Sequence, residues 1–200
     1  MIYTLVADGP SDEVLIPVLT WSLKRRGVKS VNAQWVDFRR IPRQRNLEQR
    51  LRTAVDLFPC DVLFVHRDAE AQPADIRRRE ITEAVGHMSI RHIAVVPVRM
   101  TEAWLLADER AIRLAAGNPN GHEDLSLPDI GSLEGLTDPK RVLQEALTLA
   151  CGLNSRRRSQ FPVAQRVRRI ADYIDDYSRL DALSAFRALQ RDIRELSPPH

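Results

Sequence analysis

The chain has few cysteines, very few lysines and no long apolar run. No hydrophobic stretch approaches the roughly 18 residues that a membrane-spanning helix needs. The N-terminus already has the pattern of a β-strand, which argues against a signal peptide. The two cysteines, Cys60 and Cys151, lie far apart and lack metal-ligand spacing. These absences predict a cytoplasmic protein with reduced thiols and no membrane segment.

Motifs for nucleotide hydrolysis and for nucleophilic catalysis are also missing. The turn at residues 9–12 has neither the glycine spacing of a dinucleotide fingerprint nor the Gly-Lys-Ser/Thr of a P-loop. The five histidines form no spaced ligand motif, and no serine or cysteine stands in a local nucleophile signature. A nucleotide-hydrolysing motor is therefore a poor fit to this sequence.

The positive charge comes almost entirely from arginine. Lysine occurs only at positions 24, 29 and 140, and the formal net charge is +3. Arginine suits bidentate phosphate contacts, but its spread along the whole chain favours a coding bias instead. The densest run, Arg156, Arg157 and Arg158, is a candidate for nucleic-acid contact, and the alternative is a solvated helix face.

Strand-like and helix-like segments alternate through the first 116 residues, which predicts an α/β fold with a mostly parallel sheet flanked by helices. The expected strands cover residues 2–7, 31–38, 61–66 and 92–99. The expected helices cover residues 11–26, with Ser11 as the N-cap, and residues 46–58, 73–88 and 101–116.

The composition changes after this α/β core, predicted to be residues 1–116. Residues 117–139 contain glycine, proline and acidic residues without lysine or arginine, which predicts a long acidic loop, either a functional flap or a solvated connector. Residues 140–200 are expected to form a C-terminal helical extension packed on the core, with helices near 139–151, 162–177 and 181–196.

Acidic residues follow three of the four predicted strands. Asp8 follows the first strand, Asp68 and Glu70 follow the third, and Glu102 follows the fourth. The carboxyl ends of parallel strands lie on one edge of a sheet, where carboxylates repel one another unless a cation or proton is shared. In extended geometry Asp68 and Glu70 would both face one ion. Individually, each residue could serve only to form a turn or to begin a helix; together they predict a site for Mg²⁺ or Mn²⁺.

Two segments resemble the Toprim (topoisomerase–primase) pattern of an acidic turn after the first strand and an acidic pair after the third. They are Val-Ala-Asp-Gly-Pro-Ser-Asp at residues 6–12 and Val-His-Arg-Asp-Ala-Glu at residues 65–70. Thr-Glu-Ala-Trp-Leu-Leu-Ala-Asp at 101–108 is similar to a motif of a Toprim-like family of uncharacterised bacterial proteins (domain of unknown function 4276). Asp-Pro-Lys at 138–140 and Ser-Ala-Phe-Arg at 184–187 resemble later motifs of that family, so the likeness covers most of the chain.

The resemblance implies a Toprim-like core that binds Mg²⁺. It gives Asp8 the place of the catalytic acid/base, Asp68 and Glu70 the place of the metal pair, and Glu102 the place of a further ligand. Two departures matter, because Asp8 is one methylene shorter than the usual glutamate and Glu70 replaces an aspartate. Small misplacements of reacting groups cost large rate factors. Metal binding tolerates such changes better than catalysis does.

Three hypotheses for function follow. The first is a Mg²⁺-dependent nuclease or related phosphoryl-transfer enzyme that acts on nucleic acid. For this hypothesis, similarity to Toprim-like nucleases implies an ATPase partner protein in bacterial antiphage defence. The second is a non-catalytic interaction module that retains the fold, with or without the metal. The third is a small-molecule phosphatase built on the same edge of the sheet.

Overall fold

In the described part of the chain, four parallel strands form the centre of the molecule. The computed structural model describes residues 1–41, 45–70, 72–86, 88–154 and 159–196. The strands are β1 (Ile2–Val6), β2 (Asn32–Trp35), β3 (Val62–His66) and β4 (His92–Val95), in the order β2-β1-β3-β4. Every residue of β3 is buried, as expected for a central parallel strand. The predicted α/β fold with a parallel sheet flanked by helices is confirmed at this level.

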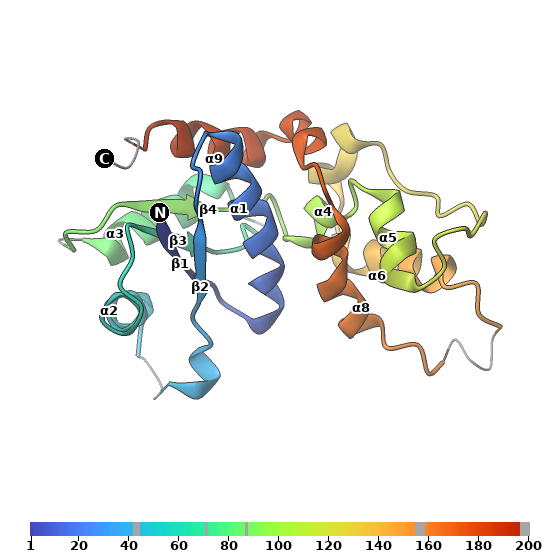
Figure 1. The fold of residues 1–200 in the computed structure, drawn as a ribbon, viewed down its shortest axis with the longest axis horizontal. Helices are drawn as coiled ribbons and strands as arrows, with labels where there is room; N and C mark the ends of the chain where they lie inside the picture. The colour runs from blue at the N-terminus through green and yellow to red at the C-terminus, as the bar shows by residue number, and fades with distance from the viewer. Residues whose placement is uncertain (42–44, 71, 87, 155–158, 197–200) are drawn as a thin grey trace.

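Helices cover both faces of the sheet (Figure 1). Helices α1 (Leu15–Arg25) and α9 (Ser184–Arg194) belong to one apolar cluster, and α2 (Leu47–Leu57) and α3 (Ala74–Val85) belong to the other. Successive strand side chains alternate between these clusters, so that Leu5 packs in the first and Val6 in the second.

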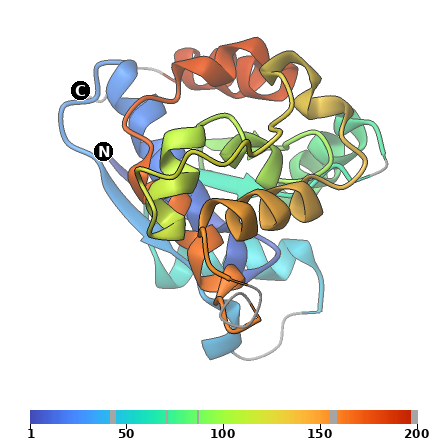
Figure 2. The same cartoon turned by 90° about the vertical axis from the view of Figure 1, so that its right-hand side faces the viewer.

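A group of helices lies beyond the carboxyl ends of the strands, at the right of Figure 1 and in front of the sheet in Figure 2. These helices are α4 (Glu102–Leu105), α5 (Glu109–Ala116), α6 (Pro139–Ala150) and α8 (Val163–Ile170). Their buried residues continue the cluster beneath α1 and α9. Trp104 of α4 meets Phe186 of α9 edge to face, with ring centroids 5.5 Å apart.

The first helix begins differently from the expectation. It opens as a 3₁₀ helix, Pro10–Val14, before α1 starts at Leu15. The backbone N–H of Gly9 donates to the Asp12 carboxylate at 2.9 Å, so Gly9 occupies the N-cap position. The prediction of Ser11 as N-cap is therefore wrong.

The predicted helix 101–116 is divided in two. The Asp108 carboxylate accepts a hydrogen bond from the backbone N–H of Ala111 at 2.9 Å and thereby starts α5 as a separate helix. The predicted helix 162–177 is shorter in the structure: α8 ends at Ile170 and is followed by a short 3₁₀ helix, Ala171–Tyr173. Similarly, α9 is preceded by the 3₁₀ helix Ser178–Ala182.

The predicted acidic loop, 117–139, is packed against the molecule. It contains the 3₁₀ helix Ile130–Gly135, and its Leu125 and Leu133 are buried in the larger cluster. The Glu134 carboxylate accepts hydrogen bonds from the backbone N–H groups of Ser184 and Ala185 at 3.0 and 2.9 Å. The loop therefore holds the N-terminus of α9, which a purely solvated connector would not do.

Two further features concern the described helices and the two cysteines. None of these helices combines the length and apolarity that crossing a membrane requires. Both Cys60 and Cys151 are free thiols, and Cys151 is buried.

Candidate functional site

The loops after β3 and β4 bring Asp68 and Glu102, two of the predicted site residues, near each other at the carboxyl edge of the sheet. The backbone N–H of Ala69 donates to Pro97 O at 3.2 Å, and that of Glu70 donates to Arg99 O at 2.9 Å. Glu70 and Arg99 both have left-handed backbone conformations, with φ of 55° and 62°. Such conformations are uncommon for these residue types and concentrate at functional sites.

Asp68 lies at the centre of this edge. Its Oδ1 atom accepts a hydrogen bond from the backbone N–H of Thr101 at 3.1 Å, and the Thr101 hydroxyl lies 3.4 Å away. The pKa of Asp68 is raised to about 6, chiefly by burial and to a smaller extent by the carboxylates of Asp12 and Glu102, while His66 and the Thr101 N–H oppose the shift. Asp68 thus gains or loses a proton near neutral pH.

His66, the last residue of β3, is buried beneath Asp68. Its Nδ1 atom lies 3.0 Å from Val95 O and, because a carbonyl only accepts, carries the hydrogen. Its Nε2 atom faces the Thr101 hydroxyl at 3.4 Å, Asp68 Oδ1 at 3.5 Å and Asp12 Oδ2 at 3.8 Å. The imidazole therefore presents one nitrogen to two carboxylates.

Asp12 completes the group from the other side. Its side chain is 12% exposed, and it is fixed by the Gly9 N–H at 2.9 Å and the Ser11 hydroxyl at 3.2 Å. We refer to Asp12, His66, Asp68, Thr101 and Glu102 as the edge cluster. The cluster contains three carboxylates and no lysine or arginine.

Asp8 and Glu70 belong to a different arrangement, an alternating series of guanidinium and carboxylate groups that we term the ion-pair chain. Its members, in order, are Arg50, Asp8, Arg67, Glu80, Arg77 and Glu70, with successive N···O distances of 3.4, 3.1, 3.1, 3.0 and 3.3 Å. Unlike the edge cluster, this chain balances its own charge.

The predicted site residues therefore divide into two pairs. Asp68 and Glu102 lie in the edge cluster, whereas Asp8 and Glu70 contact arginines. The expectation of extended geometry at 68–70 is wrong, because Glu70 adopts φ 55° and its carboxylate pairs with Arg77. Arg156, Arg157 and Arg158 lie outside the described residues.

Sequence reasoning missed His66 and Asp12 as site residues. The one available signal for His66 was a polar residue at the end of a fully apolar strand, where burial demands a partner. The position of Asp12 in the sequence favours only a helix N-terminus. Its contact with His66 spans 54 positions and depends on the register of β1 and β3.

The edge cluster offers oxygen donors that suit Mg²⁺, but it is not a closed metal cage. Within the described ranges no group of three or more histidine, cysteine or acidic side chains is placed to hold a metal ion. Mg²⁺ commonly uses only one or two protein carboxylates, with waters and substrate oxygens as the other ligands. Asp68 and Glu102 fit that requirement. Asp8 and Glu70 do not, because guanidinium groups already balance their charge.

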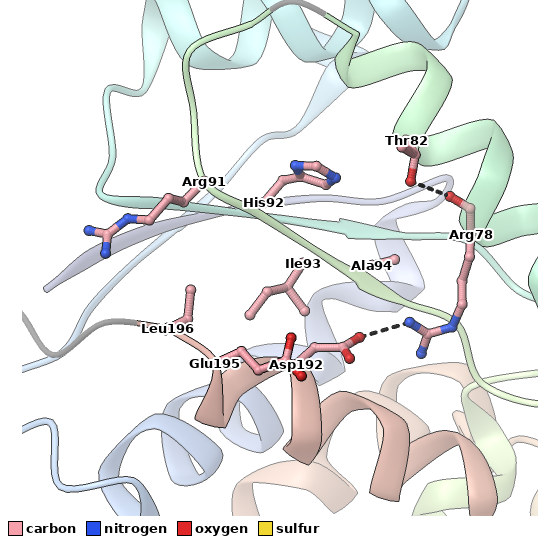
Figure 3. A pocket seen from close by; sticks show the side chains of 9 residues that line it. All are labelled: Arg78, Thr82, Arg91, His92, Ile93, Ala94, Asp192, Glu195 and Leu196. Carbon is pink, nitrogen blue, oxygen red and sulfur yellow. Dashed lines mark hydrogen bonds and ion pairs between the residues drawn. The ribbon is translucent and has the colours of Figure 1, made fainter.

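A separate pocket of about 370 Å³ lies beside β4, away from the edge cluster (Figure 3). Its walls are α3 and α9, and an ion pair between Arg78 and Asp192, with an N···O distance of 2.8 Å, joins the two helices across it. Arginines and acids are equally numerous in its lining, which gives the pocket no preference for an anion or a cation.

Comparisons with known proteins identified no relative of this chain. A scan against protein-family models, a search of curated proteins and a search of solved structures each returned no match to the chain.

Proposed function

We propose that this protein is a Toprim-like, Mg²⁺- or Mn²⁺-dependent phosphoester hydrolase, a nuclease or a related phosphoryl-transfer enzyme, with the edge cluster as its site. The observation that carries the proposal is Asp68, a largely buried carboxyl whose pKa is raised to about 6 beside Asp12 and Glu102. Carboxylates crowded in a poorly solvated place favour a bound cation or proton.

The residues of the edge cluster have distinct parts in this proposal. Without a bound cation Asp68 keeps its proton up to about pH 6, and a divalent cation would take the place of that proton. The Thr101 N–H fixes the orientation of its carboxylate, and His66 positions it from below. A divalent cation at Asp68 and Glu102 would neutralise charge on a reacting phosphate.

A hydrolysis panel tests the proposal. Single- and double-stranded DNA, RNA and p-nitrophenyl phosphate are incubated with the protein and either Mg²⁺ or Mn²⁺. We expect cleavage of at least one substrate, lost in Asp68→Asn and retained in Glu70→Gln. Cleavage of p-nitrophenyl phosphate alone would favour the small-molecule phosphatase. Activity that survives in Asp68→Asn would remove the edge cluster as the site.

Metal binding can be measured independently of turnover. In calorimetric titrations with Mn²⁺, we expect Asp68→Asn to weaken binding at least roughly tenfold, because a buried ligand and its charge are lost. Glu70→Gln should bind as the wild type does, since its side chain is 66% exposed and paired with Arg77. Weaker binding in both variants would restore Asp68 and Glu70 as the ligand pair that the resemblance implies.

A non-catalytic module is the second candidate, and the ion-pair chain favours it. Asp8 and Glu70, the two positions that depart in length from the Toprim pattern, are both held by arginines. Mn²⁺ binding without hydrolysis of any substrate would select this candidate. A nucleic-acid ligand, an ATPase partner and a role in antiphage defence belong to the proposal through the resemblance only.

A further inference from the structure

Two arginines converge on the carboxylate of Asp8. Arg67, just after β3, places Nε 3.1 Å from Asp8 Oδ2, and Arg50 of α2 places Nη1 3.4 Å from Oδ1. The two guanidinium groups are largely covered, at 25% and 22% exposure, whereas the Asp8 side chain is 47% exposed. A half-exposed anion thus sits between two cations that the fold holds.

Both guanidinium groups are anchored by contacts that do not involve Asp8. Arg50 donates from Nη2 to Ala7 O at 2.6 Å and lies over the ring of Phe38, 4.4 Å from its centroid. Arg67 donates from Nη1 to Glu80 at 3.1 Å. Because these contacts already restrict the two arginine side chains, the arginines would lose little further conformational entropy on binding an anion.

The pair of arginines suits a tetrahedral oxyanion at least as well as a carboxylate. Arginine forms its strongest contacts with carboxylate and phosphate oxygens. A phosphate group carries an additional oxygen, and as a dianion twice the charge of Asp8. Gly9, the residue after Asp8, donates its backbone N–H to the Asp12 carboxylate at 2.9 Å, and Arg67 immediately precedes Asp68 in the chain, so this place borders the edge cluster.

We propose that Arg50 and Arg67 bind the phosphate group of the substrate and that Asp8 occupies their place in the free protein. This inference rests on the proposed function, because it names the residues that would hold the substrate of that same site. It reverses the role expected of Asp8. An acid/base or metal ligand is required for binding or turnover, whereas an internal competitor weakens phosphate binding while it is present.

The test is titration of the full chain with inorganic phosphate in the absence of metal, followed by calorimetry and by the NMR signal of the Arg67 Nε–H. We expect Asp8→Ala to bind phosphate roughly fivefold more tightly than the wild type, the size of effect given by removing two partly exposed ion pairs. The double variant Asp8→Ala/Arg67→Gln should lose this gain, and so should Asp8→Ala/Arg50→Gln.

Asp37 provides a matched control. It also pairs with two arginines, Arg39 and Arg40, but these are 63% and 86% exposed. Asp37→Ala should therefore release two arginines without creating a phosphate site. A gain in Asp37→Ala equal to that in Asp8→Ala would overturn the proposal, and so would wild-type affinity in Asp8→Ala.

The outcome is separable from that of the proposed function, because phosphate binding is read without turnover. A gain in Asp8→Ala together with a failed hydrolysis panel would retain the oxyanion site and remove the enzyme. Hydrolysis by the wild type without any gain in Asp8→Ala would retain the enzyme and remove this site.

Discussion

At the residue scale, the surroundings of each carboxylate decide its chemistry more than its position after a strand does. Asp8 and Asp68 both lie two residues beyond a strand end. Asp8 is half exposed between two arginines, while Asp68 is mostly buried beside Asp12, Glu102 and His66. Burial therefore raises the pKa of Asp68 strongly.

This difference predicts a pH-dependent effect of Asp68→Asn on stability. The folded-state pKa of Asp68, about 6, lies above its ordinary value of 3.8, so the folded protein binds the proton more tightly. The stability that protonated Asp68 contributes is thus lost as pH rises from about 4 to about 6. At pH 8 the ionised group costs roughly 2–3 kcal/mol. Asparagine lacks this charge and can still accept from the Thr101 N–H.

Urea denaturation at pH 4 and pH 8 measures the effect. We expect Asp68→Asn to exceed the wild type in free energy of unfolding by roughly 1–3 kcal/mol at pH 8 and to match it near pH 4. An identical difference at the two pH values would mean that burial does not perturb this carboxyl.

At the element scale, β4 is an edge strand of the described sheet, and an ion pair lies beside its open side. Leu63 and Arg67 donate their backbone N–H groups to Arg91 O and Val95 O, so the alternate residues of β4 direct their peptide groups away from β3. The Arg78–Asp192 pair joins α3 to α9 beside this open edge, as Figure 3 shows. Charged groups at an edge hinder pairing with another chain.

Removing this pair should expose the edge. We expect Arg78→Ala to lower the free energy of unfolding by roughly 1 kcal/mol, because both partners are only 23% exposed. We also expect it to make sedimentation velocity depend on concentration. Arg110→Ala is the matched control, since Arg110 pairs with Asp175 while the side chains are 68% and 83% exposed. Equal behaviour of the two variants would show that the pair does not protect β4.

At the scale of the whole molecule, the sheet and the C-terminal helices share one apolar cluster. Phe186 of α9 packs against Trp104 of α4, and its ring centroid lies 6.3 Å from that of Trp21 in α1. Residues far apart in the chain thus depend on the same contacts, which predicts cooperative unfolding.

Phe186→Ala tests this dependence. We expect a loss of roughly 3–5 kcal/mol in free energy of unfolding, the usual cost of removing a buried phenyl ring. Tryptophan fluorescence and far-ultraviolet circular dichroism should still report one coincident transition, at a lower urea concentration. Two separated transitions would mean that residues 140–196 unfold as an independent unit.

The amino-acid sequence by itself determined the alternation of strands and helices and the edge of the sheet at which the acidic residues lie. Period-two and helical patterns mark the strands and helices, and parallel topology then places Asp8, Asp68 and Glu102 at the ends of strands. The sequence pattern did not predict every helix end. The carboxylate of Asp108 divides a helix that the apolar pattern predicts to be continuous.

Only the tertiary structure decided which carboxylates have their charge balanced by an arginine and which do not. Arg50 and Arg67 reach Asp8 across 42 and 59 positions of the chain, and His66 reaches Asp12 across 54. Such contacts depend on strand register and on the docking of α2, which no local pattern encodes. Burial then amplifies the difference, because a poorly solvated carboxylate without an arginine partner has its pKa raised.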